Sequence, residues 1–318
     1  MKKIILIIAL VALFGLLAQL ASNLYMSRVY QTPGSYVQTS SGRLHVNCTG
    51  STSSPLIVLE AGAIGWSQTW SWVQPALAKK FRVCSYDRPG LGWSDSHETL
   101  DAETAVMALH QALKEAGESL SNITLVGHSY GAIVVRAFAA KYPHLVNALV
   151  FVDGSHPDQF AILPESFVQK AKQFNDLLKP LAYLSYTGIV RLVNPLGQLA
   201  SELPDNTHFA VRYFGSSPKH LLSAYTEMQL WQQSAELAKS ASLSHTPLLI
   251  ISAAKMPDAT EHEYQAWLSL HKSMLSLSNR PKHLIIDGSD HYSLLMNPHH
   301  AARLAQHISK FINAVLKP

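Results

Sequence analysis

The longest apolar stretch of the sequence lies at its start. Two lysines precede an apolar run that extends from Ile4 to Ala21 and is interrupted at Gln19. About 18 residues of helix span roughly 27 Å, close to the thickness of the hydrocarbon core of a bilayer. The run therefore predicts either an uncleaved membrane anchor formed by residues 4–21 or a signal peptide within residues 1–24.

Gln19 favours the anchor. A signal peptidase site has a small residue three positions before the cut, and Gln19 occupies that place if the cut follows Ala21. The lysines stay on the cytoplasmic side in either case. We expect a body outside the cytoplasm, tethered through residues 4–21, or secreted if the segment is cleaved. Residues 25–40 are largely polar and are expected to form a linker.

Short apolar runs alternate with segments of helical periodicity beyond residue 40. Such runs are typical of strands buried in a parallel sheet. Alternating strands and helices predict an α/β fold, in which helices cover both faces of a mostly parallel sheet. The expected strands are Leu56–Leu59, Arg82–Tyr86, Ile123–Val126, Leu149–Val152, Leu248–Ile251 and Leu284–Ile286.

The alternation stops in the middle of the chain and resumes near its end. Residues 154–246 lack the rhythm and are interpreted as an insertion. Residues 41–153 and 247–318 then form two parts of one core. The second part ends in an amphipathic helix with Leu304, Ile308, Phe311 and Val315 on one face.

Composition narrows the class of protein. The chain of 318 residues is 47% hydrophobic and only 14% charged, which excludes a disordered chain. A net charge of +4 without runs of Lys or Arg gives no sign of a nucleic-acid partner. Sixteen histidines are scattered without an H-E-x-x-H or Cys-x-x-Cys motif, so neither a metal site nor a cofactor is expected.

The segment Gly127–Gly131 matches the pattern G-x-S-x-G. A predicted strand leads directly into it and a predicted helix follows directly. This arrangement is typical of a nucleophile elbow, which exposes the Ser129 hydroxyl at the carboxyl edge of the sheet. The alternative is an ordinary glycine-rich turn between a strand and a helix.

A serine hydroxyl needs a base to become a good nucleophile. His291 lies between the last predicted strand and the terminal helix, so the fold returns it to the sheet edge that carries Ser129. We therefore take His291 as the candidate base, against the alternative of an ordinary histidine in a surface loop.

These motifs resemble those of the α/β-hydrolase family. Besides the elbow and the late histidine, Asp87–Ser94 is similar to the family's D-x-R-G-x-G-x-S loop. Leu59–Ala63 stands where the family carries a His-Gly pair, with Ala61 in place of the usual histidine. The resemblance covers residues 42–153 and 247–316.

The resemblance implies roles for further residues. The backbone N–H groups of Ala63 and Tyr130 would form an oxyanion hole. The Asp87 loop is mostly structural in such folds and receives no chemical role. Residues 154–246 would form a helical cap, and some of its large side chains would line an apolar acyl pocket. These side chains are Phe160, Phe167, Phe174, Leu177, Leu181, Tyr183, Tyr186, Phe209, Tyr213, Phe214 and Trp231.

The expected function is that of a serine hydrolase that cleaves a carboxylic ester or related acyl bond of an apolar small molecule. A serine nucleophile argues against the family's epoxide hydrolases and haloalkane dehalogenases, which use an aspartate. The alternative is a non-catalytic ligand-binding protein on the same fold.

The carboxylate partner of His291 has two main candidates. The family usually places it after the strand that follows the cap, where the chain offers Asp258, but Asp258 lies well past Ile251. Some members use the end of the preceding strand instead, which here is Asp153. A strand end also holds a side chain more rigidly than a loop. We favour Asp153 over Asp258, with Glu261 and Glu263 as remaining possibilities.

Cys48 and Cys84 are the two cysteines of the chain. The second and fourth strands of the family's sheet are neighbours, which would bring the two sulfurs close. Export would permit a disulfide, and two buried free thiols are the equally weighted alternative.

Overall fold

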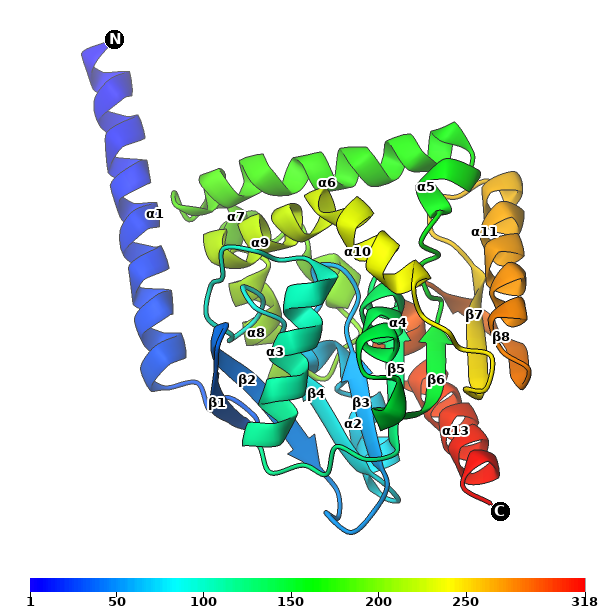
Figure 1. Cartoon of the computed structure of the whole chain (residues 1–318). Coiled ribbons are helices and arrows are strands. Elements are labelled where there is room, and N and C mark those ends of the chain that lie inside the picture. Colours follow the sequence, from blue (N-terminus) through cyan, green and yellow to red (C-terminus); the bar gives the residue numbers. More distant parts are fainter. Residues whose placement is uncertain (318) are drawn as a thin grey trace.

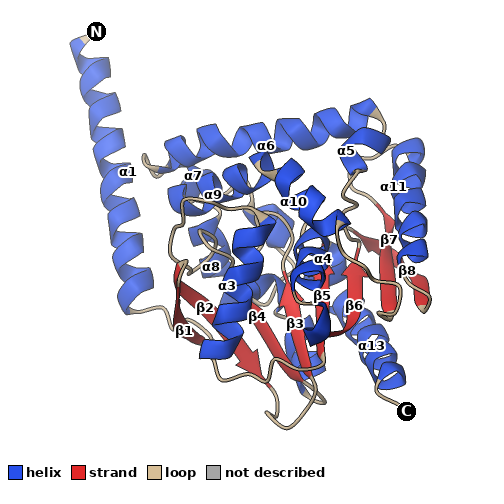
Figure 2. Ribbon diagram, viewed as in Figure 1, coloured by secondary structure: helices blue, strands red, loops and turns tan. Residues whose placement is uncertain are grey.

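The computed structural model describes residues 1–317, and it confirms the predicted α/β architecture. One sheet of eight strands has the order β1-β2-β4-β3-β5-β6-β7-β8 (Figure 2). β1 and β2 are antiparallel to their neighbours, and the other pairs are parallel. The strands are β1 Ser35–Thr39, β2 Gly42–Thr49, β3 Leu56–Glu60, β4 Arg82–Tyr86, β5 Ile123–His128, β6 Val146–Val152, β7 Leu248–Lys255 and β8 Pro281–Asp290.

Helices cover both faces of the sheet. The core on one face joins the sheet to α3, α4 and α10, and the core on the other face joins it to α2, α12 and α13. Every residue of β3 and β5 is buried, which explains why these strands are continuous apolar runs in the sequence. The helices of the core are α2 Val73–Ala78, α3 Ala102–Glu115, α4 Gly131–Lys141, α11 Glu261–Ser273, α12 Ser293–Met296 and α13 Pro298–Val315.

The segment between β6 and β7 is helical. Its longest helix, α6, lies across one end of the molecule above the sheet (Figure 1). Its last helix, α10, packs on α4 and belongs to the core on the face of the sheet that α3 and α4 cover. The helices are α5 Gln159–Ile162, α6 Glu165–Ser185, α7 Ile189–Val193, α8 His208–Phe214, α9 Pro218–Gln229 and α10 Trp231–Lys239. We refer to residues 154–246 as the cap.

The N-terminal region differs from the expected linker. Helix α1 spans Lys2–Arg28, and β1 lies within the segment that the sequence predicts to be a linker, residues 25–40. β1 is an edge strand that pairs only with β2 and is mostly exposed. An edge strand with little buried surface has no apolar alternation, so the prediction of a linker is wrong at these residues.

Helix α1 has the length and hydropathy to cross a membrane. Its window Lys2–Met26 has a mean hydropathy of 2.8, and it is the one such helix within the described residues. Most of its large apolar side chains are exposed, including Ile4, Leu13 and Leu20. A signal sequence passes the same test, so the helix alone does not distinguish an anchor from a cleaved segment.

The two cysteines are joined. Cys48 of β2 and Cys84 of β4 lie directly opposite each other in the antiparallel pair and form a disulfide. This agrees with the disulfide that the resemblance implies and excludes the free thiols.

Candidate active site

Ser129 occupies a sharp turn between β5 and α4. Its φ is 52°, in the left-handed region that non-glycine residues rarely adopt. A Cβ at Gly127 would lie 2.4 Å from the carbonyl oxygen of Gly131, and a Cβ at Gly131 would lie 2.5 Å from the carbonyl oxygen of Glu60. Both glycines are therefore sterically required, and the predicted strand–turn–helix geometry is present. Ser129 is partly exposed within an otherwise buried segment.

His291 follows directly on the last residue of β8 and contacts the predicted carboxylate. Its Nδ1 lies 2.6 Å from Oδ2 of Asp153, which is the residue after β6. The other oxygen of Asp153 accepts a hydrogen bond of 2.9 Å from the backbone N–H of Ala253. Because Nδ1 is engaged by the carboxylate, Nε2 is the nitrogen of His291 that can accept a proton.

Asp153 is buried and ionised. Burial by itself would raise the pKa of its carboxyl group, but the hydrogen bond and charge of His291 hold that pKa well below its usual range. His271 of α11 lies behind the carboxylate, with Nδ1 3.9 Å from Oδ1 of Asp153. Burial lowers the pKa of His271 to about 4, so it is neutral there. Since His271 is neutral, the group nearest to the negative charge of Asp153 that can become a cation is the ring of His291.

The other carboxylates considered lie elsewhere. Asp258 is exposed, and its backbone carbonyl accepts a hydrogen bond of 2.7 Å from the Lys170 ammonium. Glu263 caps the start of α11 through Thr260. Glu261 is exposed and accepts a hydrogen bond from Gln265. The structure thus brings Asp153 to His291 and does not bring Asp258, Glu261 or Glu263 there.

His128 links the backbone of His291 to the turn that carries Ser129. Its Nε2 lies 2.9 Å from the backbone carbonyl of His291, and the two rings are 4.7 Å apart between centroids. Burial, followed by the charge of His291, lowers the pKa of His128 to about 3, so His128 is a neutral donor to that carbonyl. The backbone of His291 is therefore held against the residue that precedes Ser129. Within residues 1–317 the Ser129 hydroxyl makes no hydrogen bond.

The loop after β3 lies against Ser129. A Cβ at Gly62 would be 3.1 Å from the Cβ of Ser129. Arg88 donates hydrogen bonds of 2.7 and 2.9 Å to the carbonyls of Ala61 and Gly62. In a trans peptide the carbonyl and the next N–H point in opposite directions, so the N–H of Ala63 points away from Arg88.

Two backbone donors at this place have no partner. The N–H groups of Ala63 and Tyr130 make no hydrogen bond within the described part of the chain. Ala63 is partly exposed, and Tyr130 is the first residue after the elbow serine, at the start of α4. Free N–H groups at a helix N-terminus attract negative charge.

A buried ionic cluster fixes this loop to the cap. Arg88 contacts Glu60 at the end of β3 and Glu227 of α9, each at 2.6 Å. The Tyr86 hydroxyl donates a hydrogen bond of 2.6 Å to Glu60. Burial raises the pKa of Glu60 to about 7, although Arg88 and Tyr86 act to lower it. All four side chains are buried, so removal of one would leave uncompensated charge or polar groups.

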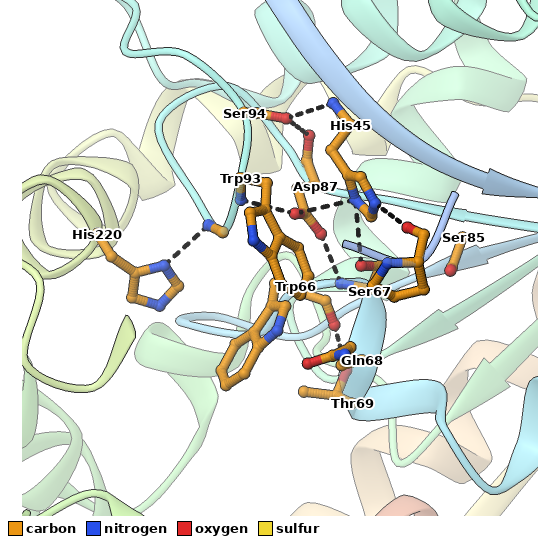
Figure 3. A network of polar contacts seen from close by, with 12 residues as sticks. His45, Trp66, Ser67, Gln68, Thr69, Ser85, Asp87, Trp93, Ser94 and His220 are labelled. Carbon is orange, nitrogen blue, oxygen red and sulfur yellow. Dashed lines mark hydrogen bonds and ion pairs between the residues drawn. The ribbon is translucent and has the colours of Figure 1, made fainter. Parts of the chain in front are cut away.

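His220 of α9 also holds the loop. Its Nδ1 accepts a hydrogen bond from the N–H of Gly92 (Figure 3). Its Nε2 lies 2.9 Å from the carbonyl of Ile64. Burial lowers the pKa of His220 to about 4, so it is neutral with the proton on Nε2. Ile64 has a φ of 58°, a strained value for a β-branched residue that this hydrogen bond helps to maintain.

A second Ser-His-Asp group lies in the same network and is structural. Ser67, His45 and Asp87 contact one another, with His45 Nδ1 3.2 Å from Asp87 (Figure 3). Asp87 also accepts hydrogen bonds from the backbone N–H groups of Ser67 and Trp93. All three side chains are buried, so no substrate can reach Ser67. The structural role that the sequence analysis gives to the Asp87 loop agrees with these contacts.

Aromatic side chains lie beside His291 and Tyr130. Trp267 of α11 lies edge-on to His291, with centroids 6.4 Å apart, and packs with Leu163 and Phe167 of the cap. The Tyr130 hydroxyl donates a hydrogen bond to Ser234 of α10. The rings of Tyr130 and Trp231 lie 5.8 Å apart.

Several residues that shape the site are absent from the sequence-based candidates. Glu60 and Arg88 lie inside segments that resemble the family, and a charged residue at the end of a buried strand is a signal that a partner is nearby. His220 and Glu227 lie in the cap, where no motif marks them. Only the folded chain places them against the loop.

Cys48, Cys84 and Glu118 are the one group of clustered potential metal ligands within residues 1–317. The disulfide removes both thiolates, and the Glu118 carboxylate is bound by Arg82. These residues do not fit a metal ion.

Comparisons with known proteins define the class. The family model described as the alpha/beta hydrolase fold matches residues 55–298. The chain therefore belongs to the α/β hydrolase fold family, as its sheet and elbow indicate.

Curated relatives include proteins of different lengths. An uncharacterized protein of Schizosaccharomyces pombe is 31% identical over an alignment that covers 37% of the chain and 27% of that protein. The uncharacterized protein YqjL of Bacillus subtilis is 26% identical, with 80% of the chain and 82% of YqjL aligned. A putative carbamate hydrolase, RutD of Klebsiella pneumoniae, is 34% identical over 35% of the chain and 42% of RutD.

Solved structures share the fold at low identity. An epoxide hydrolase of Bacillus megaterium has a TM-score of 0.65 and 18% identity, covering 88% of the chain and 100% of its own. An enol-lactonase of Burkholderia xenovorans has a TM-score of 0.60 and 17% identity, with the same coverage. At these identities the likeness shows the fold alone.

Proposed function

We propose that this protein is a serine hydrolase that cleaves a carboxylic ester or a related acyl bond through Ser129, His291 and Asp153. The observation that carries the proposal is the 2.6 Å contact between His291 and Asp153 at the sheet edge that carries the elbow serine. The carboxylate fixes the tautomer of His291, which leaves Nε2 free to act as a base.

The reaction follows from these positions. His291 Nε2 takes the proton of the Ser129 hydroxyl as its oxygen attacks the acyl carbon. Collapse of the tetrahedral intermediate releases the leaving group, which receives that proton from His291. Water, activated by His291 in the same way, then attacks the acyl-enzyme, and Ser129 regains its proton when the acid leaves.

The negative oxygen of the intermediate would bind the N–H groups of Ala63 and Tyr130. Their lack of hydrogen-bond partners and the position of Gly62 against Ser129 support this assignment. Arg88 and His220 hold the Ala63 loop from behind, so the donors are oriented before the substrate binds.

Serine at the elbow supports acyl chemistry over the other reactions found on this fold. Dehalogenases and epoxide hydrolases of the family use an aspartate where this chain has Ser129. RutD is named a putative carbamate hydrolase, and a carbamate is also opened by attack at an acyl carbon. The ring of Trp267, which lies beside His291 and packs with Phe167 of the cap, supports an apolar acyl group.

We also propose that α1 is an uncleaved anchor and that the body faces the extracytoplasmic side. The mean hydropathy of α1 and the lysines at its start support this orientation. The Cys48–Cys84 disulfide supports an oxidising compartment.

Turnover of p-nitrophenyl esters tests the function. We expect a series of rising acyl length to be hydrolysed, and Ser129→Ala to lower kcat at least about 10³-fold. Ser67→Ala is the matched control, because Ser67 belongs to the buried look-alike group, and it should keep turnover within about tenfold of wild type. A folded Ser129→Ala variant that keeps wild-type turnover would contradict the proposal, and a wild-type protein that binds esters without turnover would indicate the ligand-binding alternative.

A further inference from the structure

The end of the cap formed by α6 and α7 exposes large apolar side chains. Leu192 and Val193 are 76% and 70% exposed, values unusual for residues of a short helix in a folded domain. They are part of a continuous segment, which we call the apolar end of the cap. Its exposed residues are Tyr183, Leu184, Tyr186, Ile189, Leu192 and Val193.

Helix α1 packs against this same end of the cap. Gly15 lies so close to the turn between α6 and α7 that a Cβ would overlap the carbonyl of Thr187. The Cβ position of Gly188 is likewise only 2.7 Å from the carbonyl oxygen of Gly15. Figure 1 shows α7 beside the middle of α1, and the first half of α1 extends beyond the cap.

Contacts continue along the second half of α1. The Gln19 amide donates a hydrogen bond of 3.5 Å to the carbonyl of Ser216. The ring of Tyr25 lies 4.7 Å from that of Phe209, and Met26 is buried against α8. The cap therefore has a defined height along α1.

The contact with Gly15 places the turn between α6 and α7 inside the outer limit of the hydrocarbon core. If residues 4–21 span the hydrocarbon core, Gly15 lies six residues inside its outer limit, which is about 9 Å at 1.5 Å per residue. Monotopic helices bury their apolar faces about 5–10 Å into the boundary between headgroups and acyl chains. The contact at Gly15 thus requires the apolar end of the cap to enter the outer leaflet to that depth.

We propose that the apolar end of the cap is embedded in the lipid bilayer beside α1. The proposal rests on the proposed anchor. The two tyrosines have the amphipathic rings that gather at membrane interfaces. The cap, whose Phe167 packs with the Trp267 ring beside His291, is then seated on the lipid phase, where apolar acyl substrates partition.

Fluorescence quenching by spin-labelled lipid tests the embedding. The full chain, with its disulfide intact, is reconstituted in phosphatidylcholine vesicles, with an environment-sensitive label attached through Leu192→Cys. Met107→Cys is the control, because Met107 is 41% exposed on α3 of the core. We expect lipids that carry doxyl groups on the acyl chain to reduce the emission at position 192 at least about twofold and to leave position 107 almost unchanged.

Flotation of the same vesicles separates the anchor from the embedding. Protein that floats with the vesicles but shows equal quenching at both positions would overturn the embedding while leaving the anchor intact. Protein that does not float would overturn the anchor and the embedding together. Gly15→Leu should reduce the quenching at position 192 without loss of flotation, because its side chain cannot fit against Thr187 and Gly188; unchanged quenching would contradict the contact on which the depth rests. Ester turnover of each variant verifies that the body is folded.

Discussion

Asp153 joins a strained backbone to a defined electrostatic role. Its φ of 43° turns the chain at the end of β6, and its two oxygens are divided between Ala253 and His291. A backbone in this region is costly and is kept where surrounding contacts maintain it. Both contacts of Asp153 lie at the carboxyl edge of the sheet, and they direct one oxygen at the candidate base.

Replacement of the two candidate acids should separate them. Asp153→Asn keeps the shape but removes the charge that stabilises the imidazolium, so kcat for an ester should fall by about 10⁴-fold. Asp258→Asn changes an exposed loop and should keep wild-type turnover within about twofold. The measurement is steady-state ester hydrolysis by both folded variants. Normal turnover in the first variant and loss in the second would reverse the assignment.

The sequence alone only partly decides which of these two aspartates is the partner of His291. The order of serine, carboxylate and histidine along the chain is compatible with either aspartate. The preference for Asp153 rests on the rigidity of a strand end, and its contact with His291 agrees with that preference. The position of His271 next to the Asp153 carboxylate is not predictable from the sequence. His271 is one of many histidines on helices, and only its burial distinguishes it.

Elements differ in how well the sequence predicts them. β3, β5, β6 and β7 are short apolar runs because both faces of each strand are covered, and the sequence predicts all four. β1 lies at an edge and carries no such run, so the sequence pattern predicts a linker there. The sequence predicts the cap as an insertion, but the contacts of the cap with the loop after β3 depend on long-range packing that periodicity does not encode.

His220 is the cap residue whose removal should be most informative. His220→Ala deletes the hydrogen bonds to Ile64 and Gly92 while leaving Ser129, His291 and Asp153 in place. Because a shift of about 1 Å in a catalytic group costs up to 10²-fold, we expect kcat to fall about 10- to 100-fold with KM within about twofold. His208→Ala, in the exposed part of the same cap, is the matched control. Wild-type kcat in folded His220→Ala protein would show that the cap does not position the loop.

The molecule as a whole carries several neutral buried histidines, which couples its stability to pH. An unfolded histidine titrates near 6.5, but the pKa of His220 in the folded chain is about 4. Between these values the unfolded state binds more protons, so the free energy of unfolding falls as the pH falls. Glu60, whose pKa is raised to about 7, acts in the opposite direction, and the slope for the wild type is a sum.

The contribution of His220 is isolated by comparing how the free energy of unfolding changes with pH in the wild type and in His220→Ala. We measure the free energy of unfolding in urea at pH 7 and at pH 5. The decrease in this free energy from pH 7 to pH 5 should be about 2 kcal/mol smaller in His220→Ala than in the wild type, because one unit of pKa shift corresponds to about 1.4 kcal/mol. Equal losses in the two proteins would mean that His220 is not a buried neutral group.

The whole molecule combines a helix long and apolar enough to cross a membrane, a cap that packs on this helix and a core with the α/β-hydrolase fold. The central claim is that Ser129 is the nucleophile of this core. Labelling the full chain with a fluorophosphonate and locating the adduct by peptide mass spectrometry tests it most directly. We expect one adduct, on the peptide that contains Ser129, and no adduct in Ser129→Ala. An unlabelled wild type, or an adduct that persists on another serine in that variant, would contradict the account.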